Sequence, residues 1–267
     1  MPKLAMIGAG AMGQAIAKGL VEAKLYKAGE IKFFDLRLDL LEGLERQYGY
    51  AFAESFDELI SGLEPGSSLL FAVKPQNIDQ VLADIPEIDS SVLLISILAG
   101  TKISKYQERF PQNPIIRVMP NTPAQILKGA SALAASANCS KQNIATVQTM
   151  FDAIGLAVVV EEKDIDVVTG LSGSGPAYVF LMIEAMAEAA IKLGLNPEAA
   201  KALALQTVYG AASLAKASDK TPGELRAQVT SPNGTTAAGL ESLEKNGFKE
   251  TVFRAIAAAE KRSQELG

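Results

Sequence analysis

Histidine is absent from this sequence of 267 residues, and cysteine occurs once, as Cys139. Without imidazole the chain lacks the commonest general acid and base, the Ser-His and Cys-His nucleophile systems, and the usual ligands of transition metals. We therefore expect no metal centre. A single cysteine cannot form an intrachain disulfide, which excludes a disulfide-dense secreted scaffold and predicts a reducing, cytoplasmic location.

Excess positive charge and long apolar runs are also lacking. The 25 basic and 30 acidic residues give a net charge of -5, so the chain offers no basic footprint for nucleic acid. The apolar N-terminal run is cut by Gly8 and Gly10, too early for a secretory signal. The longest uncharged stretch, residues 167–183, is interrupted by glycines and Pro176, which argues against a membrane span. A small molecule is the expected partner.

The order of the predicted elements indicates the fold class. The chain is long enough for one large or two modest domains, and over the first 160 residues short β-rich runs alternate with helix-periodic segments. This is the pattern of repeated βαβ units and a doubly wound, mostly parallel sheet. Strands are predicted at residues 4–7, 31–34, 68–73, 92–97, 115–119, 131–135 and 157–160. Helices are predicted at residues 12–23, 37–48, 56–62, 77–83, 103–109 and 140–154.

From about Asp164 the strand pattern stops and alanine-rich helical segments take over. The sequence thus predicts an α/β fold, with a dinucleotide-binding Rossmann domain over residues 1–163 and an all-α domain over residues 164–267. The first long helix of that second domain, residues 177–193, is apolar on nearly every face and must be buried all round. A domain of this size can seldom enclose such a helix alone. We therefore expect a homodimer, or a higher homo-oligomer, built on this domain.

The clearest motif follows the first predicted strand and opens a helix. It contains Gly8, Gly10, Ala11, Met12 and Gly13. Glycines at this spacing permit a tight turn, close approach of a pyrophosphate to the backbone, and close helix-to-strand packing. The pyrophosphate of NADPH or NADH is expected at the helix N-terminus.

Two residues at the end of the second strand bear on the choice between these cofactors. Asp35 lies 22 residues beyond Gly13, close to the spacing of an acidic residue that binds a ribose 2′-hydroxyl, which favours NADH. Arg37 can instead pair with the 2′-phosphate of NADPH. A third interpretation is that both residues only cap the next helix.

Other strand ends supply further candidates, since a doubly wound sheet binds ligands at the carboxyl ends of its strands. Val73, Lys74 and Pro75 follow one strand and are candidates for contact with the nicotinamide ribose. Asn121 lies between two prolines after another strand, as a polar contact or as part of a rigid loop. We expect Arg117, within that strand, to form a structural ion pair.

Hydroxyl groups are concentrated in the helical half of the chain. Ser174 lies in a glycine-rich segment before the buried helix, either as a hydrogen-bond donor to a ligand or within a hinge. Residues 229–236 form a predicted turn and helix start, where free N–H groups and the macrodipole suit a carboxylate. The simpler alternative is N-capping by Ser231 or Thr235.

Taken together, these motifs resemble the pyrroline-5-carboxylate reductase family over essentially the whole chain. The resemblance rests on residues 7–13, 73–76, 96–100, 119–123, 173–178 and 230–236, followed by Gly239. It implies a Rossmann domain with a helical dimerisation and substrate-binding domain, and the reduction of a cyclic imine to L-proline by NADH or NADPH.

The resemblance also implies roles for individual residues. Ser231, Gly234, Thr235 and Thr236 match the turn that grips the substrate carboxylate, with Thr236 at the place that faces the imine nitrogen. Asn233 stands where the family often has a second glycine, which leaves the backbone angles of the turn open. A cyclic imine can bind already protonated and accept hydride without a strong enzyme acid, which agrees with the absence of histidine.

Three alternatives differ from this interpretation. A β-hydroxyacid dehydrogenase would share the architecture, but Val179 and Ile183 stand where its catalytic lysine and asparagine would be. A deazaflavin-dependent NADP reductase resembles the N-terminal domain only. A non-catalytic nucleotide sensor would bind the cofactor and leave it unoxidised.

Overall fold

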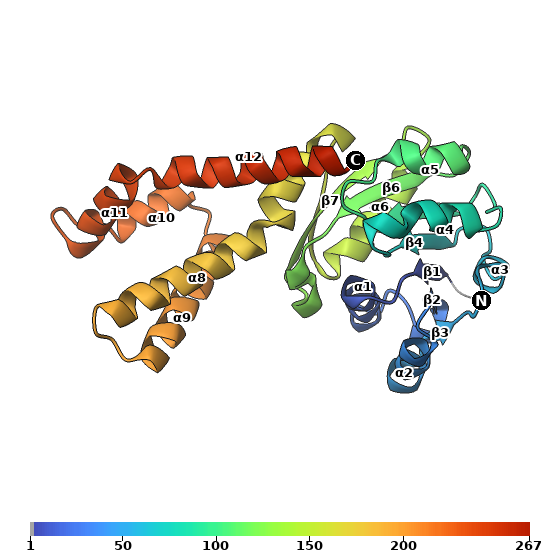
Figure 1. The fold of residues 1–267 in the computed structure, drawn as a ribbon, viewed down its shortest axis with the longest axis horizontal. Coiled ribbons are helices and arrows are strands. Elements are labelled where there is room, and N and C mark those ends of the chain that lie inside the picture. Colours follow the sequence, from blue (N-terminus) through green and yellow to red (C-terminus); the bar gives the residue numbers. More distant parts are fainter. Residues whose placement is uncertain (1–2) are drawn as a thin grey trace. The chain divides into compact units, whose positions relative to one another are not determined.

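The computed structural model describes residues 3–267, which form two compact units (Figure 1). The first unit runs to Ser174 and also includes Ala258–Gly267, and the second is Gly175–Ala257. The turns that follow residue 164 pack on the sheet, because Ile165 is fully buried with Ala132 and Ala134. For this reason the first unit extends beyond residue 163, where the strand pattern of the sequence ends.

The first unit is built on an eight-stranded sheet in the order β3-β2-β1-β4-β5-β6-β7-β8. All neighbouring strands are parallel except β6 and β7, which are antiparallel. The strands are β1 (Leu4–Ile7), β2 (Ile31–Phe34), β3 (Ala51–Phe52), β4 (Ser68–Phe71), β5 (Leu93–Ser96), β6 (Ile115–Met119), β7 (Gly129–Ala135) and β8 (Gly155–Val159).

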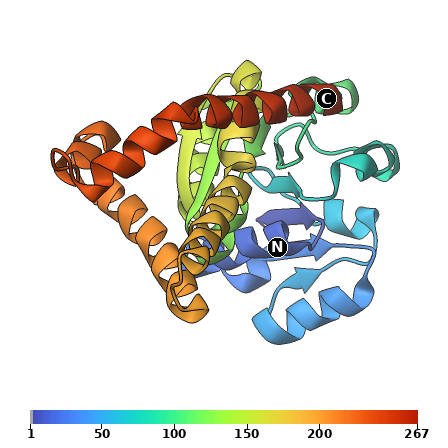
Figure 2. The ribbon, with the colours of Figure 1, turned by 60° about the vertical axis from the view of Figure 1, so that its left-hand side comes forward.

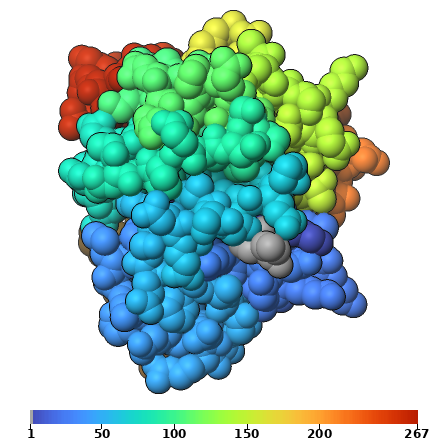
Figure 3. Space-filling model, turned by 90° about the vertical axis from the view of Figure 1, so that its right-hand side faces the viewer, coloured from blue at the N-terminus to red at the C-terminus, as the bar shows by residue number. Residues whose placement is uncertain are grey.

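Helices cover both faces of this sheet. They are α1 (Ala11–Glu22), α2 (Leu38–Tyr48), α3 (Phe56–Ile60), α4 (Ile78–Asp84), α5 (Ile103–Arg109), α6 (Lys141–Asp152) and α7 (Ile165–Val168). On β1, Leu4 and Met6 pack into the core beneath α1, α2 and α6, while Ala5 and Ile7 pack into the core beneath α3, α4 and α5. Figure 3 shows one side of the surface, on which the segments early in the sequence, in blue, lie next to the later cyan ones, which are followed by the green ones. The predicted doubly wound α/β fold is confirmed.

The seven predicted strands are all present: those at residues 4–7, 31–34 and 115–119 have the predicted bounds, and the other four have shifted ends. Val73 and Ile97 lie in loops past β4 and β5 rather than in the strands. The sequence did not predict β3, because two residues are too few to show a strand period.

The second unit is helical. Its elements are α8 (Gly175–Lys192), α9 (Pro197–Ala217), α10 (Pro222–Gln228), α11 (Thr235–Lys245) and the first half of α12 (Phe248–Leu266). Helices α8 and α9 pack side by side (Figure 1), and their buried residues are alanines: Ala187, Ala200 and Ala204. Figure 2 shows α12, in red, as one unbroken helix. Within residues 3–267, no helix is long and apolar enough to cross a membrane.

The predicted all-round burial of the first long helix is not met within one chain. Phe180 is 63% exposed and Leu181 is 64% exposed, and the buried residue that α8 contributes is Ala187. The helix also begins two residues earlier than predicted, at Gly175. Most of the glycine-rich segment before it is a π-helical turn, Thr169–Gly173, and Ser174 separates this turn from α8.

Candidate functional site

The loop between β1 and α1 shows three glycines with three different environments. Gly8 has φ +104°, and a Cβ there would lie 2.6 Å from the Ala72 carbonyl oxygen. A Cβ on Gly13 would lie 2.6 Å from the Gly8 carbonyl oxygen. A Cβ on Gly10 would meet no atom of the described chain within 4 Å. Protein packing therefore requires the first and third glycines, whereas the second leaves free space beside the backbone, as a bound pyrophosphate needs.

The N-terminus of α1 is open to an anion. Gly10 is its N-cap, and no side chain of the described residues caps it. Because the first N–H groups of a helix have no partner within the helix, those of Ala11, Met12 and Gly13 are available to phosphate oxygens at the positive end of the helix dipole. These residues fit a dinucleotide.

Two side chains hold the Ala9 peptide groups of this loop. The Ala9 N–H donates to Asp35 Oδ2 at 2.9 Å, and Gln14 Nε2 donates to the Ala9 carbonyl oxygen at 2.7 Å. Asp35 thus joins the loop after β2 to the loop after β1. Sequence reasoning missed Gln14, because a glutamine in a first helical turn is also an ordinary solvent-exposed residue.

The Asp35 carboxylate accepts four hydrogen bonds. Besides the Ala9 N–H, it accepts from the Arg37 backbone N–H at 3.1 Å and from Arg37 Nε and Nη2 at 2.9 Å each. Partial burial acts to raise the pKa of Asp35, but the hydrogen bonds from Arg37 and Ala9 outweigh it and hold this pKa below its ordinary value. The ion pair therefore persists at neutral pH. Arg37 is the N-cap residue of α2 without a side-chain cap, so the capping interpretation is wrong for it.

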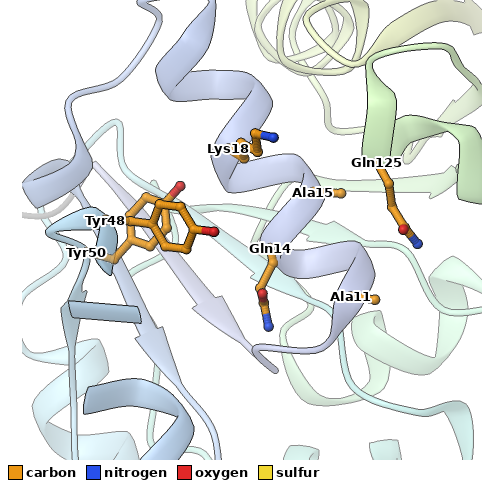
Figure 4. Close-up of a pocket in the computed structure, with 7 residues that line it drawn as sticks. All are labelled: Ala11, Gln14, Ala15, Lys18, Tyr48, Tyr50 and Gln125. Carbon is orange, nitrogen blue, oxygen red and sulfur yellow. The ribbon is translucent and has the colours of Figure 1, made fainter. Parts of the chain in front are cut away.

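A shallow pocket of about 210 Å³ lies beside α1 (Figure 4). Its lining is Ala11, Gln14, Ala15, Lys18, Tyr48, Tyr50 and Gln125. The rings of Tyr48 and Tyr50 lie against each other, with centroids 5.5 Å apart. Burial, with the nearby Tyr48 and Glu22, raises the pKa of Tyr50 to about 12. This phenol is therefore a weaker proton donor than an ordinary tyrosine.

The loops after β4 and β6 differ in whether their polar side chains are exposed or already hydrogen-bonded within the protein. Lys74 and Pro75 are exposed, and Pro75 starts a 3-10 turn. The Asn121 amide donates to the Ser172 carbonyl oxygen at 3.0 Å and accepts from the Ala130 N–H at 2.9 Å. Asn121 therefore braces its loop against the π-helical turn that precedes Ser174.

The predicted ion pair of Arg117 is confirmed, with Glu162 at 3.4 Å.

In the second unit, the turn before α11 presents a second uncapped helix N-terminus. Gly234 is the N-cap residue, and no side chain within the described part of the chain caps α11. The predicted alternative of capping by Ser231 or Thr235 is therefore wrong. A Cβ on Gly234 would overlap Ser231 Oγ, so a side chain there would require the Ser231 hydroxyl to move. The Gly234 N–H donates to the Ser231 carbonyl oxygen at 3.0 Å, which leaves the N–H groups of Thr235 and Thr236 free for a carboxylate.

The backbone of this turn has a left-handed residue at Asn233. Its φ is +57°, in the left-handed region. Glycine adopts this region freely and asparagine tolerates it better than most residues. The residue that departs from the family pattern therefore still allows the turn.

Comparison with known protein families matches the two parts of the sequence to two different families. Residues 162–266 match the family described as pyrroline-5-carboxylate reductase dimerisation. Residues 3–100 match the family described as NADP oxidoreductase, coenzyme F420-dependent. As predicted for the deazaflavin-dependent alternative, that second likeness lies in the N-terminal part.

Full-length relatives and solved structures agree. The chain is 42% identical to a pyrroline-5-carboxylate reductase of Synechocystis sp. over 99% of this chain and 98% of the relative. It is 39% identical to one of Arabidopsis thaliana, over 99% and 95%. The crystal structure of Plasmodium falciparum pyrroline carboxylate reductase with NADP bound matches at 36% identity and TM-score 0.85, over 100% and 98% of the two chains. One from Coxiella burnetii matches at 33% identity and TM-score 0.91, with the same coverage. This chain therefore belongs to the pyrroline-5-carboxylate reductase family.

Proposed function

We propose that this chain reduces 1-pyrroline-5-carboxylate to L-proline with NADPH or NADH, the last step of proline biosynthesis, in the cytoplasm. The observation that carries the proposal is the pair of uncapped helix N-termini, at α1 beside a dinucleotide loop and at α11 behind Gly234. One suits a pyrophosphate and the other a carboxylate. A substrate that has one carboxylate and a reducible C=N bond matches these two anion sites. It also matches a chain without histidine, because a protonated imine needs no strong enzyme acid.

The reaction needs positioning more than acid catalysis. The cofactor supplies a hydride to the ring carbon of the C=N bond, and the protonated nitrogen becomes the secondary amine of proline. The backbone N–H groups at Thr235 and Thr236 hold the carboxylate, assisted by Ser231 and Ser174. The Thr236 hydroxyl meets the ring nitrogen. Positioning of this kind supplies a large part of a rate enhancement.

On the cofactor side, we assign the pyrophosphate to the loop from Gly8 to Gly13. Val73, Lys74, Pro75 and Asn121 belong to the loops at the carboxyl edge of the sheet, where the nicotinamide half of a dinucleotide binds. Lys74 and Pro75 are exposed there, and Asn121 contributes by bracing its loop.

The contacts of Asp35 and Arg37 favour NADPH. A carboxylate offers about four lone-pair positions, and Asp35 already accepts four hydrogen bonds. A ribose hydroxyl would have to displace one of them. Arg37 uses only Nε and Nη2 in this pair, its side chain is 60% exposed, and guanidinium groups bind phosphates well. Arg37 can therefore take the 2′-phosphate while remaining paired with Asp35.

The exposed apolar side chains of α8 support a homodimer. Val179, Phe180, Leu181, Met182 and Met186 are each between 36% and 64% exposed on one helix. Exposed apolar surface of this extent marks a protein interface. A second copy of the same helical unit would cover it.

The function is tested by following nicotinamide absorbance while 1-pyrroline-5-carboxylate is added to the purified protein. We expect oxidation with both cofactors and a larger kcat/KM with NADPH. Dinucleotide that binds and stays unoxidised would support the sensor alternative instead.

Replacement of Thr236 tests the substrate side of the site. We expect Thr236→Ala to lower kcat about 100-fold, the scale for losing one hydrogen bond to the reacting group, while the Kd for NADPH changes less than about twofold. Thr251→Ala, an exposed threonine on α12, is the control and should change neither. Equal losses of turnover and cofactor affinity would contradict the assignment.

Replacement of Arg37 tests the cofactor preference. Arg37→Ala should raise the KM for NADPH about ten- to hundredfold, because a charge-assisted contact to phosphate is lost, and leave the KM for NADH nearly unchanged. Arg46→Ala, on the same helix, should alter neither value. Similar losses with both cofactors would mean that Arg37 acts only through Asp35 and the glycine loop.

Sedimentation tests the homodimer. The wild-type protein should have twice the chain mass of 28.1 kDa, or a higher multiple. Phe180→Glu should lower the assembled mass, since a charge would be buried at the interface. Ile126→Glu, at an exposed apolar residue of the first unit, should leave it unchanged. A wild-type protein of single-chain mass would refute the proposal.

A further inference from the structure

Two buried hydroxyl groups meet beside the end of β5. Ser96, the last residue of this strand, is 1% exposed, and Tyr106, on α5, is fully buried. Their oxygen atoms lie 2.5 Å apart, and Ser96 Oγ also accepts the Leu98 N–H at 3.3 Å. A paired hydroxyl inside a core stabilises a fold little more than an apolar group of the same shape would. What the pair adds is a fixed contact to the loop that follows β5.

The position of Tyr106 is fixed by contacts on two sides. Its ring packs against the ring of Phe71, at the end of β4, with centroids 5.1 Å apart. The Ile103 N–H, at the start of α5, donates to Glu162 Oε1 at 2.7 Å, and Glu162 is paired with the buried Arg117. Helix α5 is therefore held against the sheet at its first turn, and the phenol that it carries lies in a fixed place.

Tyr106 does not act as an acid on a ligand. Burial raises the pKa of its phenol well above the ordinary value and outweighs the opposite effects of the hydrogen bond with Ser96 and of the Arg117 charge. The side chain also has no exposed surface through which a substrate could reach it. Its hydroxyl therefore acts on a ligand only through Ser96 and the loop.

The loop after β5 alternates between partly exposed and buried residues. Ile97 and Ala99 are partly exposed, whereas Leu98 and Gly100 are buried. The Ile97 N–H donates to the Phe71 carbonyl oxygen at 3.1 Å, which holds the start of the loop beside the end of β4. By accepting the next-but-one N–H, the serine at the end of β5 fixes the backbone that turns Ile97 and Ala99 outward.

The strand order places this loop on one side of the cofactor site. The order reverses between β1 and β4, and β5 is the next strand beyond β4. A dinucleotide binds across such a reversal, at the carboxyl ends of the strands. With the pyrophosphate at the glycine loop after β1 and the 2′-phosphate at Arg37 after β2, the other half of the cofactor extends over β4 and β5. That half carries the nicotinamide.

We propose that Tyr106 and Ser96 are positioning residues that fix the loop after β5 against the nicotinamide half of the bound dinucleotide. Tyr106 acts through Ser96, and Ser96 acts through the Leu98 N–H. All three residues belong to the first unit. The inference rests on the proposed function, because the cofactor and its orientation are taken from there.

Binding measurements on the full chain test the positioning role. Tyr106→Phe removes the hydroxyl and keeps the ring, and it should raise the Kd for NADPH about three- to tenfold, the scale of one hydrogen bond. The Kd for adenosine 2′,5′-bisphosphate should change less than about twofold, because this molecule lacks the nicotinamide and its ribose. A merely structural role would weaken the binding of both ligands together or of neither.

A double variant tests the order of action. Ser96→Ala should weaken NADPH binding more than Tyr106→Phe does, because it also removes the acceptor of the Leu98 N–H. Adding Tyr106→Phe to Ser96→Ala should raise the Kd for NADPH by less than a further factor of about two, since the phenol acts through the serine. Effects that multiply would show that Tyr106 acts independently and would overturn the proposed coupling.

Tyr26→Phe is the matched control, because it makes the same chemical change in the same unit. Tyr26 is partly buried in the connection from α1 to β2, at the opposite edge of the sheet, and its hydroxyl donates to Met150 Sδ at 3.8 Å. This variant should bind both ligands as the wild type does.

Two results would refute the positioning role: a Kd for NADPH within twofold of wild type in Tyr106→Phe, or an equal loss of affinity for both ligands. A wild-type protein that binds NADPH without reducing the imine would contradict the proposed function alone, since the positioning role is decided by the Kd values. A wild-type protein that does not bind NADPH would overturn both.

Discussion

The guanidinium of Arg117 constrains much of the first unit. It is buried in β6, inside the sheet, where an unpaired charge would cost several kcal/mol or more. Two carboxylates lie against it, from the 3-10 turn at Glu162 and from α7 at Asp166. The segment that leaves the sheet after β8 is thereby held close to the strand. Those carboxylates in turn fix the start of α5 and the end of α12. One charge thus links five elements that are far apart in sequence.

The chain has no imidazole, and backbone N–H groups at two helix starts take its place as ligand-binding groups. At α1 and α11 the N-cap residue is a glycine, so the first N–H groups remain available to a ligand. Elsewhere in the chain Ser55, Ser140, Asn196 and Thr221 cap their helices with a side chain. A side-chain cap would compete with a bound anion for the same N–H groups. Helices α2, α4 and α5 also begin without a side-chain cap, so what marks α1 and α11 is that the N-cap residue is a glycine, which leaves room for an anion beside the free N–H groups.

The sequence predicted the doubly wound sheet and seven of its strands, because alternating strands and helices leave a strong periodic pattern. It also identified the glycine loop and the turn at residues 230–236. It did not predict the hydrogen bond from Gln14 to Ala9 or the link from Ser263 to Asp166. Such contacts join residues through the fold, and neither glutamine nor serine carries a spacing that marks them. The π-helical turn before α8 was missed for a related reason, since glycines and serines there indicate a loop by composition.

The carboxylate turn is constrained in different ways at two neighbouring residues. Asn233 adopts a left-handed backbone at φ +57°, a conformation that asparagine reaches with modest strain. Gly234 has an ordinary extended backbone, with φ -81° and ψ 171°. Its conformation would admit any residue, but Ser231 Oγ occupies the space that a side chain would need. Backbone freedom is therefore the requirement at residue 233 and empty space is the requirement at residue 234.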